Sequence, residues 1–108
     1  MISVILVNPE TPGNIGFIAR AMANFNINDL IIVEPKCSHL EGEAVRNSMH
    51  SKGILKSAKV WDYNTLSKIK ESYDLVIGTS SIVSRDYNIK RTPVFPWDLV
   101  ISKKTAIL

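Results

Sequence analysis

The residues best suited to chemistry stand near the start of the chain, between Asn8 and Met22. An apolar run, Ile2 to Val7, precedes them, and a turn with two prolines, two glycines and two asparagines leads into an amphipathic helical pattern. In α/β proteins such a turn is where ligand groups bind, because the first amides of the helix can face an anion. Gly13 and Gly16 permit close backbone approach or unusual dihedrals. The alternative is a well-capped strand–helix turn without a ligand.

Arg20 carries the charge that a site at this turn would use. At about 100° per residue it lies nearly opposite the predicted apolar stripe, so we expect its side chain to face away from the core. The stripe consists of Ile18, Ala21, Met22 and Phe25. Asn14 stands where it can cap the helix through its side chain. On geometry alone, a solvated surface arginine is the commoner outcome.

A second polar stretch, Gly78-Thr79-Ser80-Ser81, follows the apolar run Leu75-Val76-Ile77. Small hydroxyl residues at the end of a buried strand can donate hydrogen bonds to a cofactor and let it approach closely. An ordinary polar loop is the alternative. Further along, three basic residues stand among aromatic ones, a mixture that suits RNA phosphates and splayed bases. They are Arg85, Lys90 and Arg91.

The elements that must position these residues alternate along the chain. Short apolar strands and helical patterns follow one another, which predicts an α/β fold: a Rossmann-like parallel sheet with helices on both faces. The expected strands are Ile2–Val7, Leu30–Val33, Lys59–Trp61, Leu75–Gly78 and a start at Thr105–Leu108. The expected helices are Asn14–Asn26, Glu41–His50 with a possible continuation to Ser57, and Thr65–Glu71 capped by Asn64. Right-handed crossovers place the loops after the first and fourth strands at one sheet edge and bring them together.

Composition sets broad limits on function. The chain has 108 residues, 45% of them hydrophobic, and a net charge of +3, which fits one soluble domain, residues 1–108, with a mildly basic surface compatible with RNA. Cys37 is the single cysteine, so no internal disulfide or cysteine-based zinc site can form, and we expect a cytoplasmic protein. His39 and His50 have no metal-ligand spacing, and no run is long enough to cross a membrane. We therefore expect neither a metal nor a membrane partner.

Three stretches resemble the SPOUT superfamily of knotted RNA methyltransferases, of the SpoU (TrmH) type. The segment Asn8–Met22, with Pro-Gly-Asn-Ile-Gly and Ala-Arg-Ala, is similar to the first motif of this family. The segment Ala44–Val60 is similar to the second helix and third strand of the TrmJ-like branch, and Leu75–Ser81 to its strand ending in Gly-Thr-Ser. The resemblance covers essentially the whole chain and implies 2′-O-methylation of RNA ribose, in the anticodon loop of tRNA.

The resemblance also assigns roles to residues. It places Arg20 at the reacting ribose, with Asn14 orienting Arg20 or contacting substrate, and it places Gly78, Thr79, Ser80 and Ser81 against S-adenosylmethionine. A guanidinium is a poor base, so holding the adjacent phosphate and stabilising the attacking oxygen is the safer role for Arg20. Arg85 stands further along the chain than the basic residue that the family usually has after Gly-Thr-Ser, so the sequence departs from the family pattern at this point. A homodimer is expected for the full-length protein.

The family pattern continues beyond the last residue printed here. Two further motifs, a glycine- and glutamate-containing loop and a Ser-Leu-Asn segment that threads the knot, are expected after the fifth strand. We therefore expect an incomplete domain that is inactive by itself. The alternative function is a non-enzymatic RNA-binding or interaction module on the same half-fold. A Rossmann-type nucleotide binder is weaker, since no G-x-G-x-x-G or Walker sequence follows a strand.

Overall fold

Five parallel strands form one sheet in the order β3-β2-β1-β5-β4 within the residues that the computed structural model describes, 1–79 and 105–107. The strands are β1 (Ile2–Val7), β2 (Asp29–Val33), β3 (Lys59–Trp61), β4 (Leu75–Ile77) and β5 (Thr105–Ile107). The helices are α1 (Pro12–Asn24), α2 (Gly42–Ser48), α3 (Lys52–Ser57), α4 (Tyr63–Ser67) and α5 (Ile69–Ser72). The bounds of β1 and β3 are those predicted from the sequence.

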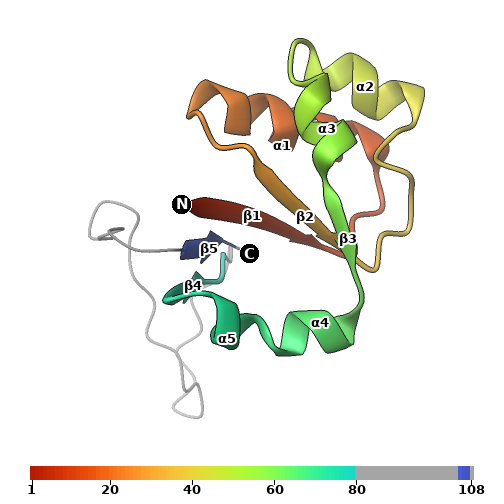
Figure 1. The fold of residues 1–108 in the computed structure, drawn as a ribbon. Coiled ribbons are helices and arrows are strands. Elements are labelled where there is room, and N and C mark those ends of the chain that lie inside the picture. The colour runs from red at the N-terminus through yellow and green to blue at the C-terminus, as the bar shows by residue number, and fades with distance from the viewer. Residues whose placement is uncertain (80–104, 108) are drawn as a thin grey trace, which may run out of the picture.

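Helices cover both faces of the sheet, which confirms the predicted α/β class. Helices α1, α2 and α3 lie on one face, and α4 and α5 lie on the other (Figure 1). Because side chains alternate along a strand, Leu30 and Ile32 join the core under α1–α3, whereas Ile31 and Val33 join the core under α5. This double burial explains why β2 is apolar at four consecutive positions.

The buried face of α1 agrees with the predicted stripe at Met22 and at Ile18, which is half-buried against the core, and differs from it elsewhere. Its core residues are Ile15, Ala19 and Met22, whereas Ala21 is exposed and Phe25 is 77% exposed. The helix begins at Pro12, two residues before the predicted start, and it ends at Asn24, so Phe25 lies beyond its last turn. Proline is favoured in the first turn because its fixed φ already suits a helix.

Two glycines allow α1 to pack closely on α2. A Cβ added to Gly16 would lie 2.3 Å from the carbonyl oxygen of Ala44, and one added to Gly13 would lie 2.6 Å from the Glu43 carboxylate. Neither glycine has a positive φ. Of the two roles predicted for these glycines, the structure shows close approach, and the element that approaches is α2.

The other helices break where the sequence pattern did not indicate it. The helix expected over Glu41–His50 is α2, which ends at Ser48, and its possible continuation to Ser57 is a separate helix, α3, because Met49 has a φ of 55°. The helix expected at Thr65 begins at Tyr63 instead, and Asp62 caps it by accepting a 2.8 Å hydrogen bond from the Thr65 amide. The prediction of Asn64 as the cap is therefore wrong: Asp62 precedes the first turn, whereas Asn64 lies within it.

Candidate functional site

The loop between β1 and α1 is held tightly at the carboxyl edge of the sheet. The Asn8 amide donates to the Val33 carbonyl at 2.8 Å, and the Lys36 amide donates to the Pro9 carbonyl at 2.9 Å. The Lys36 ammonium also pairs with the Glu10 carboxylate at 3.0 Å, and this contact raises the pKa of Lys36 above its ordinary value. Three consecutive residues of the loop are thus joined to the last residue of β2 and to the segment that follows it.

Asn14 is exposed in the first turn of α1. The residue at the cap position is Thr11, and no side chain caps the helix there. The prediction that Asn14 caps α1 through its side chain is wrong, because Pro12 starts the helix two residues earlier. The backbone N–H of Asn14 donates to the Thr11 carbonyl at 3.1 Å. The side chain of Asn14 is exposed to solvent.

Arg20 is exposed on α1, as the sequence predicted. Six residues of helix separate it from Asn14, which is about 9 Å along the axis and about 120° around it. Among residues 1–79 and 105–107 Arg20 forms no hydrogen bond or ion pair. The guanidinium is therefore free, as far as the described part of the chain extends, to bind an anion from solvent.

Gly78 and Thr79 follow β4 and are exposed at the same edge of the sheet. Ile77 pairs with Ile107, which pairs with Val4, so β5 stands between β4 and β1. Two strand spacings are about 10 Å, and the three residues from Val4 to the end of β1 add about 10 Å along the strands. The two predicted loops therefore start at the same edge of the sheet, with β5 between the strands that lead into them.

Five predicted site residues lie outside the described residues. These are Ser80, Ser81, Arg85, Lys90 and Arg91. The structure therefore places Asn14 and Arg20 on one helix but on different sides of it, places Gly78 and Thr79 after β4, two strands from β1, and leaves the other candidates as predictions.

A polar cluster that the sequence analysis missed lies at the ends of three neighbouring strands. Asn8 follows β1, Glu34 follows β2 and Tyr63 follows β3. The Tyr63 hydroxyl hydrogen-bonds to the Asn8 side chain, which in turn donates to the Glu34 carbonyl. The signal available in the sequence was position alone, since each residue comes one or two places after a predicted strand.

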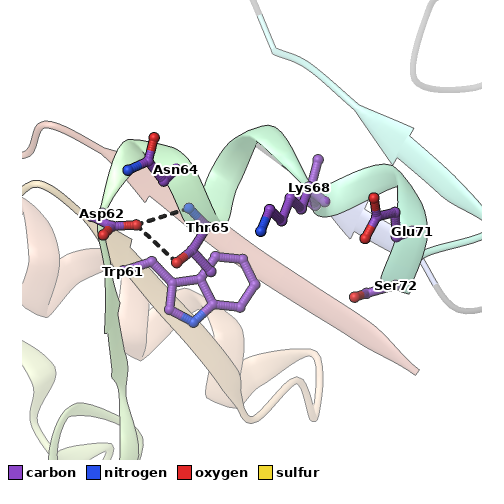
Figure 2. Close-up of a pocket in the computed structure, with 8 residues that line it drawn as sticks. Trp61, Asp62, Asn64, Thr65, Lys68, Glu71 and Ser72 are labelled. Carbon is purple, nitrogen blue, oxygen red and sulfur yellow. Dashed lines mark hydrogen bonds between the residues drawn. The ribbon is translucent and has the colours of Figure 1, made fainter.

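A hollow of about 320 Å³ lies beside α4 and α5 (Figure 2). None of the predicted site residues lines it. The Asp62 carboxylate at its rim accepts hydrogen bonds from the Thr65 amide and hydroxyl, and these bonds hold the pKa of Asp62 below its ordinary value. Its lining residues are Trp61, Asp62, Asn64, Thr65, Lys68, Ile69, Glu71 and Ser72.

The described residues provide no metal site. No three His, Cys, Asp or Glu side chains gather within them to hold an ion. Burial, helped by the negative charges of Glu41 and Glu43, raises the pKa of the Cys37 thiol, which disfavours the thiolate that a metal or a nucleophilic reaction needs. Over the same residues no helix has the length and apolar character needed to span a bilayer.

Comparison with known proteins identifies the family. The model of the SpoU rRNA Methylase family matches residues 1–108. The chain belongs to this family. It is 46% identical over 99 residues to the tRNA (cytidine-2′-O-)-methyltransferase TrmJ of Methanocaldococcus jannaschii, which covers 92% of this chain and 42% of that protein. It is 38% identical over 105 residues to the tRNA (cytidine/uridine/adenosine-2′-O-)-methyltransferase TrmJ of Pseudomonas aeruginosa, covering 97% and 36%.

Solved structures agree with this assignment. The fold matches TrmJ from Z. mobilis ZM4 with a TM-score of 0.77 and 25% identity, covering 99% of this chain and 48% of that one. It matches a probable methylase family protein from Haemophilus influenzae with a TM-score of 0.77 and 29% identity, covering 98% and 44%. The predicted SPOUT fold is confirmed, and the chain spans less than half the length of these relatives.

Proposed function

We propose that this chain is part of an RNA methyltransferase that transfers a methyl group to a ribose 2′-hydroxyl, with tRNA as the substrate. The observation that carries the proposal is the 46% identity to a tRNA 2′-O-methyltransferase over 92% of the chain. The proposal extends to a nucleotide of the anticodon loop and a homodimer of the full-length protein, which the family resemblance implies, and to a cytoplasmic location, which the single cysteine favours.

Arg20 is the residue that would act on the substrate. A guanidinium keeps its proton at any physiological pH, so it acts as a hydrogen-bond donor and a fixed charge. It would hold the phosphate beside the target ribose with two parallel hydrogen bonds and stabilise negative charge on the attacking oxygen. Asn14 would contact the same substrate with its side-chain amide. Methyl transfer is an in-line displacement, so orientation of the two reactants contributes most of the acceleration.

The family implies S-adenosylmethionine as the methyl donor. Gly78 and Thr79 leave room for such a ligand, because both are exposed and no described residue other than the two chain neighbours of Gly78 comes within 4 Å of where its Cβ would be. When bound, S-adenosylmethionine supplies a methyl group activated by its sulfonium. The proposal places Gly78, Thr79, Ser80 and Ser81 against this cofactor, and Arg85, Lys90 and Arg91 against RNA.

The test is methyl transfer by the complete gene product. Purified enzyme, tRNA transcripts and radiolabelled S-adenosylmethionine would report the rate, and mapping of 2′-O-methyl groups would locate the nucleotide. Replacing Arg20 by Ala is expected to lower kcat about 100- to 1000-fold, the usual cost of losing one donor to a developing oxyanion. Arg46→Ala is the matched control, since Arg46 is an exposed arginine on α2. Equal losses in both variants would contradict the role of Arg20.

The alternative, a non-enzymatic RNA-binding module, makes a different prediction. The complete protein would then bind tRNA but would neither transfer a methyl group nor bind S-adenosylhomocysteine in isothermal titration. The 108-residue chain tested by itself is expected to show no methyl transfer in either case. Robust transfer by this chain alone would overturn that expectation.

A further inference from the structure

Tyr63, Asn8 and Glu34 form a hydrogen-bonded clasp across the carboxyl ends of β3, β1 and β2. The Tyr63 hydroxyl donates to the Asn8 side-chain oxygen, and the Asn8 side-chain nitrogen donates to the Glu34 carbonyl at 3.1 Å. The strand register brings these residues level, because the last residues of β1, β2 and β3 pair with one another. The clasp therefore joins residues that are 26 and 55 positions apart in sequence.

The backbone of two members of the clasp is in the left-handed region. Asn8 has a φ of 53°, which asparagine tolerates, whereas Glu34 has a φ of 45°, which costs strain at a glutamate. Such conformations persist where surrounding contacts hold them, and they cluster at functional sites. Here the backbone contacts are hydrogen bonds from the Asn8 amide to Val33 at 2.8 Å and from the Glu34 amide to Trp61 at 3.0 Å.

The clasp stands at the start of the loop that leads to the proposed substrate residues. Asn8 is the first residue after β1, and α1, which carries Asn14 and Arg20, begins four residues later. The other end of the loop is also held, since the Asn47 side chain donates to the Gly13 carbonyl at 3.3 Å. The loop is thus fixed at both ends, and the direction in which α1 leaves the sheet depends on both attachments.

We propose that Tyr63 is a positioning residue of the methyltransferase site, which acts through Asn8 and the clasp to fix the first turn of α1. This inference rests on the proposed function, because it assumes that Asn14 and Arg20 contact the RNA. Tyr63 itself is 51% exposed, so its side chain packs little against the core and its hydroxyl makes the contact that matters. Preorganisation of this kind acts on turnover, since small displacements of reacting groups reduce rates strongly.

The test compares two Tyr→Phe variants of the complete protein, each of which removes one phenolic hydroxyl. Tyr63→Phe is expected to lower kcat about tenfold and to leave KM within about twofold of the wild-type value. The expected loss is smaller than the roughly 100-fold that a 1 Å misplacement of a reacting group costs. Tyr73→Phe is the matched control, because its hydroxyl donates to Ser3 at 2.8 Å at the other end of β1. It is expected to lower the melting temperature and leave kcat unchanged.

A double-mutant cycle with Asn8→Gly separates positioning from general loosening. Glycine tolerates the positive φ at this position, so the variant removes the side chain without adding strain. If the hydroxyl acts through Asn8, the double variant has the same kcat as Asn8→Gly alone. Wild-type kcat in Tyr63→Phe, or additive losses in the double variant, would overturn the proposal.

Hydrogen exchange provides a readout that does not need activity. The Lys36 amide, bonded to Pro9 within the same loop, is expected to exchange faster in Tyr63→Phe and not in Tyr73→Phe. Equal exchange in both variants would refute the clasp even in a fully active enzyme. Absence of methyl transfer by the wild-type protein would refute the proposed function and, with it, the positioning role. Faster exchange of the Lys36 amide in Tyr63→Phe would establish the clasp even then.

Discussion

Replacing Gly16 by Ala is expected to destabilise the protein, although alanine is the better helix former. Alanine gains about 1 kcal/mol over glycine in a helix interior. The added Cβ, however, would lie 2.3 Å from the Ala44 carbonyl oxygen and 2.8 Å from the Asn47 Cβ. A backbone carbonyl moves only if α2 moves, and overpacking costs about 1–3 kcal/mol, more where the backbone must shift.

Because α2 must shift, the cost lies at the upper end of this range, about 2–3 kcal/mol, and the gain of about 1 kcal/mol from alanine leaves a net loss of stability of about 1–2 kcal/mol. At this size of domain, 1 kcal/mol corresponds to about 4–8 °C, so the melting temperature of Gly16→Ala falls by about 5–15 °C. Thermal and urea unfolding followed by far-ultraviolet circular dichroism measures the change. An unchanged m-value would show that the difference lies in stability and not in the compactness of the unfolded chain.

Two other glycines make the controls. Gly53 lies in α3 with no atom within 4 Å of its Cβ position, so Gly53→Ala is expected to stabilise the protein by about 0.5–1 kcal/mol. Gly13→Ala is intermediate, because its Cβ would meet the movable ends of Glu43 and Asn47 at 2.6 and 2.8 Å. If Gly16→Ala were as stable as Gly53→Ala, the close packing of α1 on α2 would be refuted.

Two further predictions test α1 and the cap of α4. Met22 is 3% exposed, so Met22→Ala should lower the free energy of unfolding in urea by about 2–5 kcal/mol, whereas Phe25→Ala should change it by less than about 0.5 kcal/mol. Similar losses in the two variants would show that Phe25 is part of the buried face, as the sequence predicted. The pKa of Asp62 is lower in the folded than in the unfolded protein, so its ionised carboxylate stabilises the folded state at pH values above its unfolded pKa of about 4. This stabilisation is lost as the pH falls through the folded pKa. Asp62→Asn should therefore lower the melting temperature at pH 7, and a difference that failed to narrow below pH 4 would contradict this origin.

Strands were easier to predict from this sequence than helix boundaries. The bounds of β1 and β3 agree with the prediction, because apolar residues flanked by turn residues are a local signal. The predicted start of α1 was wrong because Pro12 and Asn14 both suit a helix start, and Pro12 is the residue that begins it. The predicted stripe also omitted Ile15 and Ala19, which are buried.

The sequence predicted which residues of the site carry charge and face solvent better than it predicted which distant residues contact one another. Exposure of Arg20 followed from helical periodicity, and the motif around it led to the correct family. Contacts between distant segments carried no such signal. The clasp of Tyr63, Asn8 and Glu34 depends on the register of three strands, and nothing in the residues near Asn8 indicates a tyrosine 55 positions later.

The sequence alone determined the class of the fold, the family and the helix that carries Arg20, because periodicity and motif spacing are local properties of the chain. Only the tertiary structure decided how the loops are arranged. It inserted β5 between β1 and β4, so the strands that lead into the two predicted loops are not neighbours in the sheet. It also assigned Gly16 to packing against α2, since strand order and helix contacts depend on which distant surfaces bury each other best.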